Sequence, residues 1–330
     1  LGVYLYGWDR VSPRWHAFAG VVVAVSGCAS GLFVVCANAW MNAPAGFRMV
    51  NGQPTDIDPI AALLNPAAFH QALHMTLAAY LSVAAAAAGI HAALLLRRPD
   101  DALHRRALSI VLPVLCVAAF LQPLSGDLSA KAVAKQQPAK LAAMEGHWRT
   151  ERRAPLLVGG IPDEQAEVTR GAIELPGMLS FMAFGDFNAE VRGLSSFPRP
   201  DRPPVLIPHL AFQVMVGSGS LLAAMAVAIV GFRLRRRGPT QHPLMLRALV
   251  LVSPLGLIAL EAGWVVTEVG RQPWIVQGFM RTRDAVTPVP GLWLPLSVIA
   301  ALYLFLAVVV VALLKREVFA ASEKDGPNVR

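Results

Sequence analysis

A histidine and a methionine inside apolar segments are the residues of this sequence best suited to hold a metal-bearing cofactor. His74 lies in FHQALHMTLAAY, one turn after a second candidate, His70, and Met215 lies in HLAFQVMVGSGS. An imidazole in hydrocarbon normally faces other helices, where it pairs with a carbonyl group, a water molecule or a metal. A His and a Met from different helices can clamp one haem iron, and this ligand pair suits electron transfer. The alternative is a hydrogen-bonded interior histidine and a methionine that only fills space.

Glu261 and Glu268 are carboxylates in a later apolar segment that ends in EAGWVVTEVGRQPW. Trp264 precedes Glu268 by one turn, and Arg271 follows it. Charge in hydrocarbon is expensive, so an acidic residue there indicates a functional site. For Glu268 the alternative is an interfacial ion pair with Arg271. For Glu261 the choice lies between proton transfer and a buried hydrogen bond.

The segments that must position these residues are those of a membrane protein. Hydrophobic residues make up 55% of the chain, charged residues make up 15%, and the mean hydropathy is +0.51, more than a soluble surface tolerates. Several apolar stretches reach the ~20 residues needed to cross the hydrocarbon layer. We therefore predict an all-α polytopic transmembrane bundle with small residues at helix contacts, and the opening LGVYLYGWDR as the last turns of a partial first helix. The six complete spans are predicted at residues 15–37, 69–95, 107–124, 207–232, 246–268 and 291–314.

Arginines in the short connections predict the orientation of the bundle. Segments 97–106 and 233–247 carry four and five arginines, whereas segment 41–68 carries only Arg48. The positive-inside rule therefore places the two arginine-rich segments in the cytoplasm. The outer face then receives, by alternation along the chain, segments 41–68, 125–206 and 269–290.

This topology brings three candidate ligands from three different helices, His74, Met215 and Glu268, near the outer face. The sequence has neither the adjacent His pair of a haem–copper centre nor the regularly spaced His pairs of the cytochrome b of quinol–cytochrome c reductases, which disfavours both families. Segment 125–206 is too long for a turn and is predicted to fold as an external loop with functional content. The predicted division is helices over 1–124, this loop over 125–206, helices over 207–315 and a cytoplasmic tail over 316–330.

Charge and cysteine content exclude other classes of protein. The net charge of +8 comes from arginines beside apolar segments, without the aromatic interleaving of a single-strand binding face, so no nucleic-acid partner is expected. Cys28, Cys36 and Cys116 all lie in apolar segments without CxxC or CxxCH spacing. Disulfides, structural zinc and covalently attached haem are therefore unsupported, and the cysteines are expected to pack as small residues.

Eight short blocks together resemble subunit I of the cytochrome bd-type quinol oxidases. The resemblance runs from Gly7 to Lys315, and its specificity comes from the order of the blocks and from the last of them. The blocks are GWDR (7–10), ANAWMNAPAGF (37–47), LNPAAFHQALH (64–74), GD (126–127), KLAAMEGHW (140–148), GIPDEQ (160–165), FQVMVG (212–217) and GWVVTEVGRQPW (263–274).

The resemblance implies roles for the residues already singled out. His74 and Met215 resemble the axial ligands of a low-spin haem b, and Glu268 resembles the ligand of a high-spin haem b. Trp264 would be an electron-transfer neighbour between haems, and Arg271 would neutralise haem propionates. Electrons would pass from quinol at the outer face through both haems to an oxygen-reactive haem, where O2 is reduced to water with protons drawn from the cytoplasm.

Further roles follow from the same resemblance. Lys140 and Glu145 match loop residues tied to quinol oxidation, where a carboxylate could accept a quinol proton; the alternative is a solvated helical salt bridge. Ser30 and Asn38 match polar groups associated with proton delivery, to which Glu261 could also contribute. The alternative for Ser30 and Asn38 is a hydrogen bond that cross-links membrane helices.

Two departures from the family pattern are visible. Gln213 stands where many members carry Arg, so charge stabilisation of the reduced low-spin haem is expected to be weaker. FQVMVG and the short loop look like the cyanide-insensitive branch, in which the third haem is d or b. The family's first helices, with a His ligand for this haem, are absent, so the chain reads as N-terminally truncated.

The function expected from these residues is that of a haem-bearing subunit of a quinol oxidase. Its partners would be ubiquinol or another quinol, O2, an oxidase subunit II, a small single-span subunit and the lipids of a bacterial inner membrane. Two other classes stay open. A transporter or channel would use the buried His and Glu residues as an ion path, and a structural subunit would use His74 and Met215 for packing.

Overall fold

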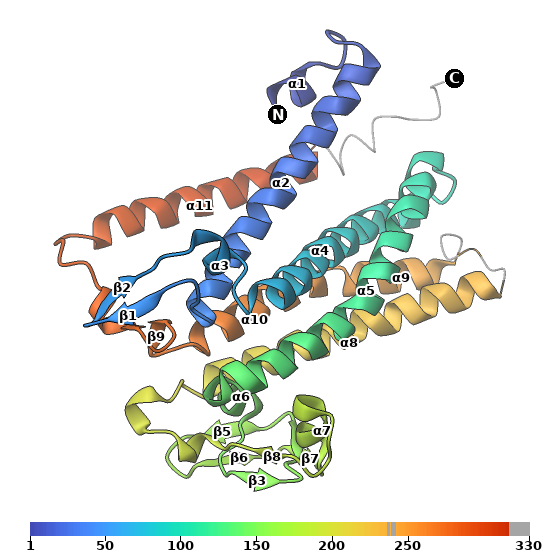
Figure 1. Ribbon diagram of the computed structural model, residues 1–330. Helices are drawn as coiled ribbons and strands as arrows, with labels where there is room; N and C mark the ends of the chain where they lie inside the picture. The colour runs from blue at the N-terminus through green and yellow to red at the C-terminus, as the bar shows by residue number, and fades with distance from the viewer. Residues whose placement is uncertain (236–237, 239–241, 317–330) are drawn as a thin grey trace.

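Long apolar helices dominate the computed structural model, which describes residues 1–235, 238 and 242–316. Six helical segments in this part are long and apolar enough to cross a membrane, which confirms the predicted bundle and its number of spans. Figure 1 shows the N-terminus close to one end of α2 and the folded loop near the opposite end of the bundle. The segments are α2 (Pro13–Asn42), α4 (Ala68–Arg97), α5 (Ala102–Gln136), α8 (Leu206–Leu234), α9 with α10 (Pro243–Val252 and Leu255–Val269) and α11 (Trp293–Leu313).

Two predicted segments extend beyond the part of the chain that the structure describes. The predicted tail 316–330 lies outside it after Arg316, and the arginine-rich segment 233–247 is described only in part. The short helix α1 (Gly2–Tyr6) occupies the predicted partial first helix. Cys28, Cys36 and Cys116 are all free thiols, as expected.

Helix α5 is longer than its apolar stretch. It continues past residue 124 to Gln136, so residues 125–136, predicted as part of the loop, belong to the helix. In this extension Lys131 donates to Asp127 at 2.6 Å with i,i+4 spacing, which stabilises a polar helical end. Mean hydropathy falls at these charged residues. It therefore marks the end of the apolar segment, but it does not mark the end of the helix.

The main core lies where α4 meets α5, α8 and α9. Small side chains repeat along α4 and let the neighbouring helices approach closely, as membrane helices do. At its contact with α10, Ser82 donates from its hydroxyl to the carbonyl oxygen of Gly256 at 2.8 Å. The buried alanines of α4 in this core are Ala84, Ala85, Ala88 and Ala92.

We expect Gly256→Ala to destabilise the bundle by about 1–3 kcal/mol, because overpacking a filled contact forces backbone movement. A Cβ atom at residue 256 would lie 2.7 Å from the Cα atom of Ser82, which is backbone and cannot rotate away. The apparent midpoint of thermal unfolding in detergent measures the effect. Gly219→Ala on α8 is the matched control, since a Cβ atom there meets no described atom within 4 Å and should leave the midpoint unchanged or slightly raised. Equal midpoints for the two variants would contradict the prediction.

The loop between α5 and α8 begins with the short helix α6 (Pro138–Glu145), which Gly146 ends in a left-handed conformation. Beyond it the chain folds into a nested ladder of three antiparallel strand pairs. Figure 1 shows this ladder below the ends of α5 and α8. The outermost pair is β3 (Glu151–Arg152) with β8 (Glu190–Val191), the next β4 (Leu156–Val158) with β7 (Ile173–Leu175), and the innermost β5 (Ile161–Asp163) with β6 (Val168–Arg170). Helix α7 (Met178–Phe184) and the 3-10 turns η1 (Leu194–Ser196) and η2 (Arg199–Asp201) complete the loop.

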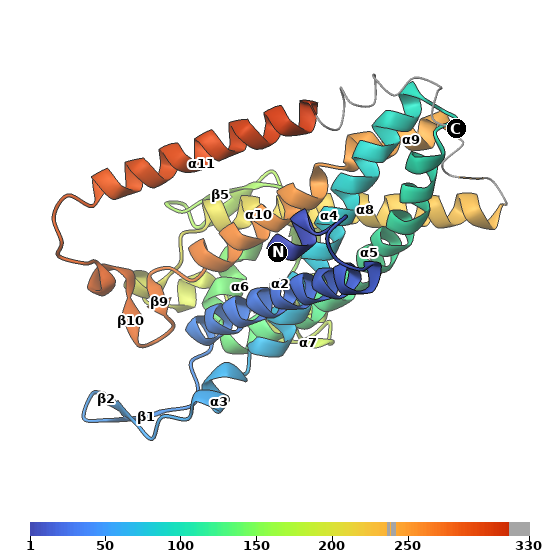
Figure 2. The same ribbon diagram turned by 90° about the horizontal axis from the view of Figure 1, so that it is seen from above.

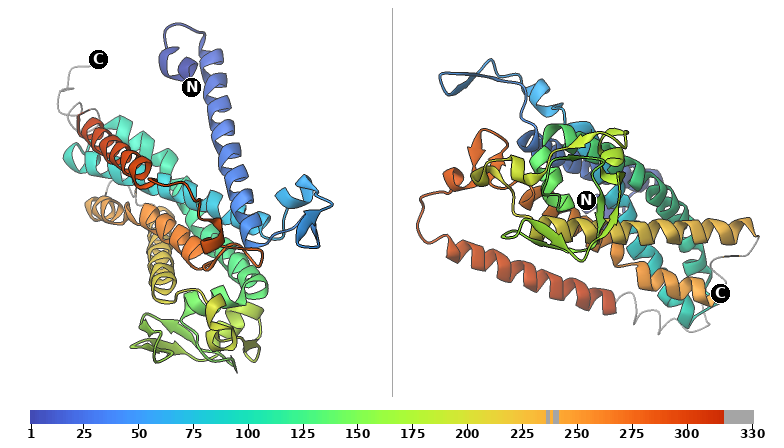
Figure 3. Two further views of the ribbon diagram at one scale, coloured as in Figure 1. Left: turned by 90° about the vertical axis from the view of Figure 1, so that its left-hand side faces the viewer. Right: turned by 90° about the horizontal axis from the view of Figure 1, so that it is seen from below.

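Two smaller connections also fold into hairpins. The first carries the hairpin of β1 (Arg48–Val50) and β2 (Gln53–Thr55) and then α3 (Pro59–Leu63). The second carries the hairpin of β9 (Trp274–Val276) and β10 (Met280–Arg281) and the turn η4 (Thr282–Ala285). Helix α11 follows and stands apart from the other helices in Figure 2, as α2 does over much of its length in Figure 3, left. No described residue of α11 is buried within this chain.

Candidate functional site

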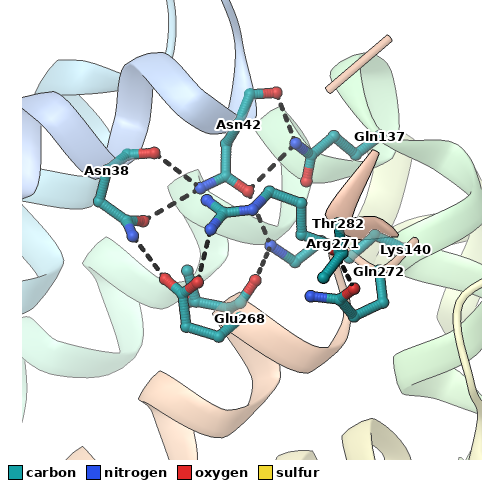
Figure 4. Close-up of polar contacts among 9 residues, drawn as sticks. Asn38, Asn42, Gln137, Lys140, Glu268, Arg271, Gln272 and Thr282 are labelled. Atoms are coloured by element: carbon teal, nitrogen blue, oxygen red, sulfur yellow. Dashed lines mark hydrogen bonds and ion pairs between the residues drawn. The ribbon is translucent and has the colours of Figure 1, made fainter. Parts of the chain in front are cut away.

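Glu268, near the end of α10, lies at the centre of a polar network where the ends of α2 and α10 meet α6. Asn38 of α2 donates from its amide nitrogen to Oε1 at 2.5 Å, and Arg271 donates from Nη2 to Oε2 at 2.5 Å (Figure 4). The Glu268 side chain is 43% exposed within this chain, so one side of its carboxylate is open to a further ligand. The ion pair with Arg271, which was the alternative considered for Glu268, is therefore present, and it leaves part of the carboxylate exposed.

The network continues through Asn42, one turn after Asn38 on α2. Asn42 Oδ1 accepts from Lys140 Nζ at 3.1 Å and from Gln137 Nε2 at 3.2 Å, as Figure 4 shows. Lys140 also donates to the carbonyl oxygen of Thr267 at 3.1 Å. These contacts fasten α6 to α2 and to the end of α10, so the loop helix is held beside Glu268.

We expect Asn42→Leu to destabilise the protein by about 1–3 kcal/mol, because it removes a buried side-chain oxygen that accepts from both Lys140 and Gln137, and each of them keeps only a carbonyl acceptor. The apparent midpoint of thermal unfolding measures this loss. Ser30→Ala on the same helix is the control, since Ser30 is exposed and its replacement should change stability by less than about 0.5 kcal/mol. A midpoint for Asn42→Leu that matches the control would contradict the prediction.

Arg271, the cation that pairs with this carboxylate, is buried, with 4% of the residue exposed. Nη2 is bonded to Glu268, but Nε and Nη1 have no hydrogen-bond partner among the described residues. A buried donor without an acceptor destabilises a folded protein, so we expect these two nitrogens to bind an acceptor. Guanidinium binds carboxylates in a forked geometry, and the arrangement therefore fits a carboxylate group of a bound cofactor.

His74 has its tautomer set by the neighbouring turn of α5. The Ser125 hydroxyl donates to the carbonyl oxygen of Gln122 at 2.9 Å, so its oxygen can accept from His74 Nδ1 at 3.0 Å. With the proton on Nδ1, the lone pair of the imidazole is on Nε2, which lies at hydrogen-bond distance, 3.2 Å, from the Gln122 amide nitrogen. In this tautomer Nε2 is the ring atom able to bind a metal, once the Gln122 amide moves away from it.

Met215 lies half-buried on α8, which packs against α10. A Cβ atom at Gly263 would lie 3.2 Å from the Met215 sulfur atom, so a glycine there leaves room for the thioether. His74 and Met215 contact different neighbours in this chain, the first on α5 and the second on α10. An imidazole with a free Nε2 and a thioether form the donor set of a low-spin haem.

Lys140 and Glu145, the two quinol-loop candidates on α6, are buried, with 5% and 4% of each residue exposed. The alternative of a solvated salt bridge is therefore wrong. Burial, reinforced by the charge of Arg271, lowers the pKa of Lys140 to about 7, although Glu268 acts to raise it. Burial raises the pKa of Glu145 to about 8. Glu145 Oε2 has no hydrogen-bond partner among the described residues.

The remaining candidates lie in different surroundings. Asn38 is joined to Glu268, Trp264 is half-buried on α10, and Ser30 and Glu261 are exposed on the surface of this chain. Gln213 contacts the loop between α5 and α8: it donates to the carbonyl oxygen of Leu157 at 2.9 Å and accepts from the backbone nitrogen of Gly159 at 3.1 Å.

Three residues of this region were missed from sequence. Asn42 and Gln137 join the network, and the polar positions of ANAWMN within an apolar helix are the signal that points to Asn42. His209 is fully buried, with Nδ1 at 3.0 Å from the carbonyl oxygen of Met144 and Nε2 at 3.2 Å from that of Gly159. It holds the start of α8 against α6 and the loop.

Comparison with known proteins shows which family and which solved structure this chain is similar to. The model of the family "Cytochrome bd terminal oxidase subunit I" matches residues 1–321. A Bacillus subtilis (strain 168) protein provisionally named as subunit I of a cytochrome bd menaquinol oxidase is 36% identical over 87% of this chain and 66% of its own length. Cytochrome bd ubiquinol oxidase subunit 1 of the same strain is 30% identical over 98% of this chain and 72% of its own length. The solved bd oxidase of Geobacillus thermodenitrificans matches with a TM-score of 0.87 and 36% identity, over 97% of this chain and 74% of that one.

Proposed function

The chain belongs to the cytochrome bd terminal oxidase subunit I family, and we propose from this premise that it is the haem-bearing subunit of a quinol oxidase that reduces O2 to water. The chain spans 66% of the length of the first relative described above. The proposed activity is therefore that of the whole enzyme to which such a chain belongs. The observation that carries the proposal is the cluster of Glu268, Arg271 and Lys140 at the outer ends of α10 and α6.

The residues that would hold the haems are His74 with Met215 for a low-spin haem b, and Glu268 for a high-spin haem b. Support comes from the contact of His74 Nδ1 with Ser125, which leaves the lone pair on Nε2, from the space beside the Met215 sulfur atom and from the exposed side of the Glu268 carboxylate. Arg271 would neutralise a propionate through the two nitrogens that lack a partner here. When bound, the haems supply one-electron transfer and, at a third haem of type d or b, the reduction of O2.

Quinol would be oxidised at α6, where Glu145 would take a proton from a quinol hydroxyl. A carboxyl group with a pKa of about 8 is well matched to this task, since it can bind and release a proton near neutral pH. Lys140, fixed by Asn42 and the carbonyl oxygen of Thr267, would place positive charge beside the reaction. Trp264 would assist electron transfer from its place on α10.

The partners proposed are ubiquinol or another quinol, O2, an oxidase subunit II and a small single-span subunit. The apolar exposed faces of α2 and α11 support a chain surrounded by lipid and other subunits. We place the chain in a bacterial inner membrane with its C-terminus in the cytoplasm, on the strength of the arginine-rich connections.

The reduced-minus-oxidised optical spectrum of the purified oxidase that contains this chain tests the proposal, together with quinol-dependent oxygen uptake. We expect bands of low-spin and high-spin haem b and oxygen uptake that depends on added quinol. A preparation that assembles without haem, or with haem but without quinol-dependent uptake, would refute it. The first of these results would favour the transporter or structural classes.

A further inference from the structure

His70 lies in the first turn of α4 with 7% of the residue exposed. Both ring nitrogens are buried and have no hydrogen-bond partner among the described residues. Ser129 of α5 donates to the backbone carbonyl oxygen of His70 at 3.4 Å, so the helices meet here while the imidazole stays unpaired. Buried polar atoms in folded proteins are almost always bonded, so the ring calls for a partner that this chain does not supply.

The surroundings of His70 favour an anion as that partner. Helix α4 is 30 residues long, and its N-terminal end carries the partial positive charge of the helix dipole. Its first turn has no acidic residue, and its N-cap, Ala67, provides no side-chain cap. The positive end of the helix dipole would stabilise a bound carboxylate, whereas it would do little for a neutral hydroxyl group.

The position of His74 indicates which carboxylate this would be. His70 precedes His74 by four residues, so both side chains lie on the same face of α4, with His70 one turn nearer the outer end. We propose that His70 and the N-terminus of α4 bind a propionate of the low-spin haem b, a role distinct from the iron ligation assigned to His74. The inference rests on the proposed haem at His74 and Met215.

A donor at a propionate has a measurable effect on the haem. It offsets negative charge beside the iron, and reduction adds one more electron, so the donor favours the reduced form. His70→Phe, which removes the donor, should therefore lower the equilibrium constant for reduction of the low-spin haem by about threefold to tenfold, tenfold being about 59 mV for one electron. His70→Gln keeps an N–H donor and should restore most of that loss.

The test is a spectroelectrochemical titration of the purified, fully assembled oxidase. His91→Phe is the matched control, since His91 lies toward the other end of α4, where its Nδ1 is 3.1 Å from His104 Nδ1. Reduced-minus-oxidised infrared spectra with haem labelled with carbon-13 at the propionates provide a second readout. We expect the carboxylate bands to shift in His70→Phe and to keep the wild-type position in His91→Phe. If His70→Phe does not assemble, His70→Leu is measured in the same way.

The outcomes separate this inference from the function on which it rests. A wild-type oxidase without a low-spin haem b signal would remove the proposed function itself. A normal signal with an unchanged potential and unchanged carboxylate bands in His70→Phe would overturn the propionate assignment alone. The propionate assignment is also overturned if His70→Phe raises the KM for quinol while the potential and the bands stay at wild-type values, because His70 would then contact the substrate.

Discussion

Replacing His74 with alanine is expected to abolish the low-spin haem b signal of the purified oxidase and to lower quinol-dependent oxygen uptake by at least about 100-fold. Loss of a group that only orients a metal ligand typically costs 10–100-fold in affinity or activity, and removing the ligand itself should cost more. Alanine removes the Nε2 lone pair that the contacts of Ser125 leave available. Met215→Leu keeps the volume of the side chain but removes the sulfur, so the same signal should be lost or converted to a high-spin form.

Controls for this result are available on the same helices. His91→Ala removes a histidine farther along α4, and Met225→Leu replaces a methionine of α8 that belongs to the hydrophobic core. Both should retain the low-spin band. The high-spin band assigned to Glu268 should survive in all four variants, since its carboxylate is held by Asn38 and Arg271. Unchanged spectra in both His74→Ala and Met215→Leu would refute the ligand assignment.

The spans and the helix carrying each candidate ligand could be predicted because hydrocarbon imposes a simple rule on composition. The end of α5 could not be predicted by that rule, since Asp127 and Lys131 stabilise a helix through their pairing and not through hydropathy. The position of His74 near the N-terminal end of α4 could be predicted from the bounds of the apolar segment. The contact of its Nδ1 atom with Ser125, 51 residues away, depends on how α5 is rotated about its own axis. The pattern of apolar residues does not show this rotation.

The polar network shows a second limit of sequence reasoning. Glu268 and Arg271 are three residues apart, so their pairing could be foreseen. Asn38 is 230 residues from Glu268, and their hydrogen bond depends on how α2 is rotated against α10. The burial of Lys140 and Glu145 was likewise hidden, because an eight-residue helix in a charged loop reads as solvated until the segments that cover it are placed.

Replacing Glu145 with glutamine is expected to lower kcat for quinol oxidation by about 10²- to 10⁴-fold, the usual contribution of a positioned general base. The variant keeps the shape of the side chain and removes its ability to accept a proton. In the wild-type protein the carboxyl group is neutral well below pH 8, so the rate should rise as pH increases through its pKa of about 8. The low residual rate of Glu145→Gln should lack this rise, and steady-state oxygen uptake between pH 6 and 9 measures both.

The same pKa predicts that the stability of the protein depends on pH. This dependence is expected if Glu145 is buried, and it is not expected if Glu145 is exposed to water near the substrate. Because burial raises the pKa of Glu145 above its ordinary value of 4.5, the folded protein keeps a proton that the unfolded chain has released between about pH 4.5 and 8. The contribution of Glu145 to the free energy of unfolding therefore falls as pH rises through this window, and Glu145→Gln should remove that part of the fall. Glu174→Gln, at an exposed position of β7, should leave both the rate profile and the stability profile unchanged. A Glu145→Gln enzyme with a wild-type pH profile for quinol oxidation would show that another group takes the proton, and an unaltered stability profile would show that Glu145 ionises as it does in water.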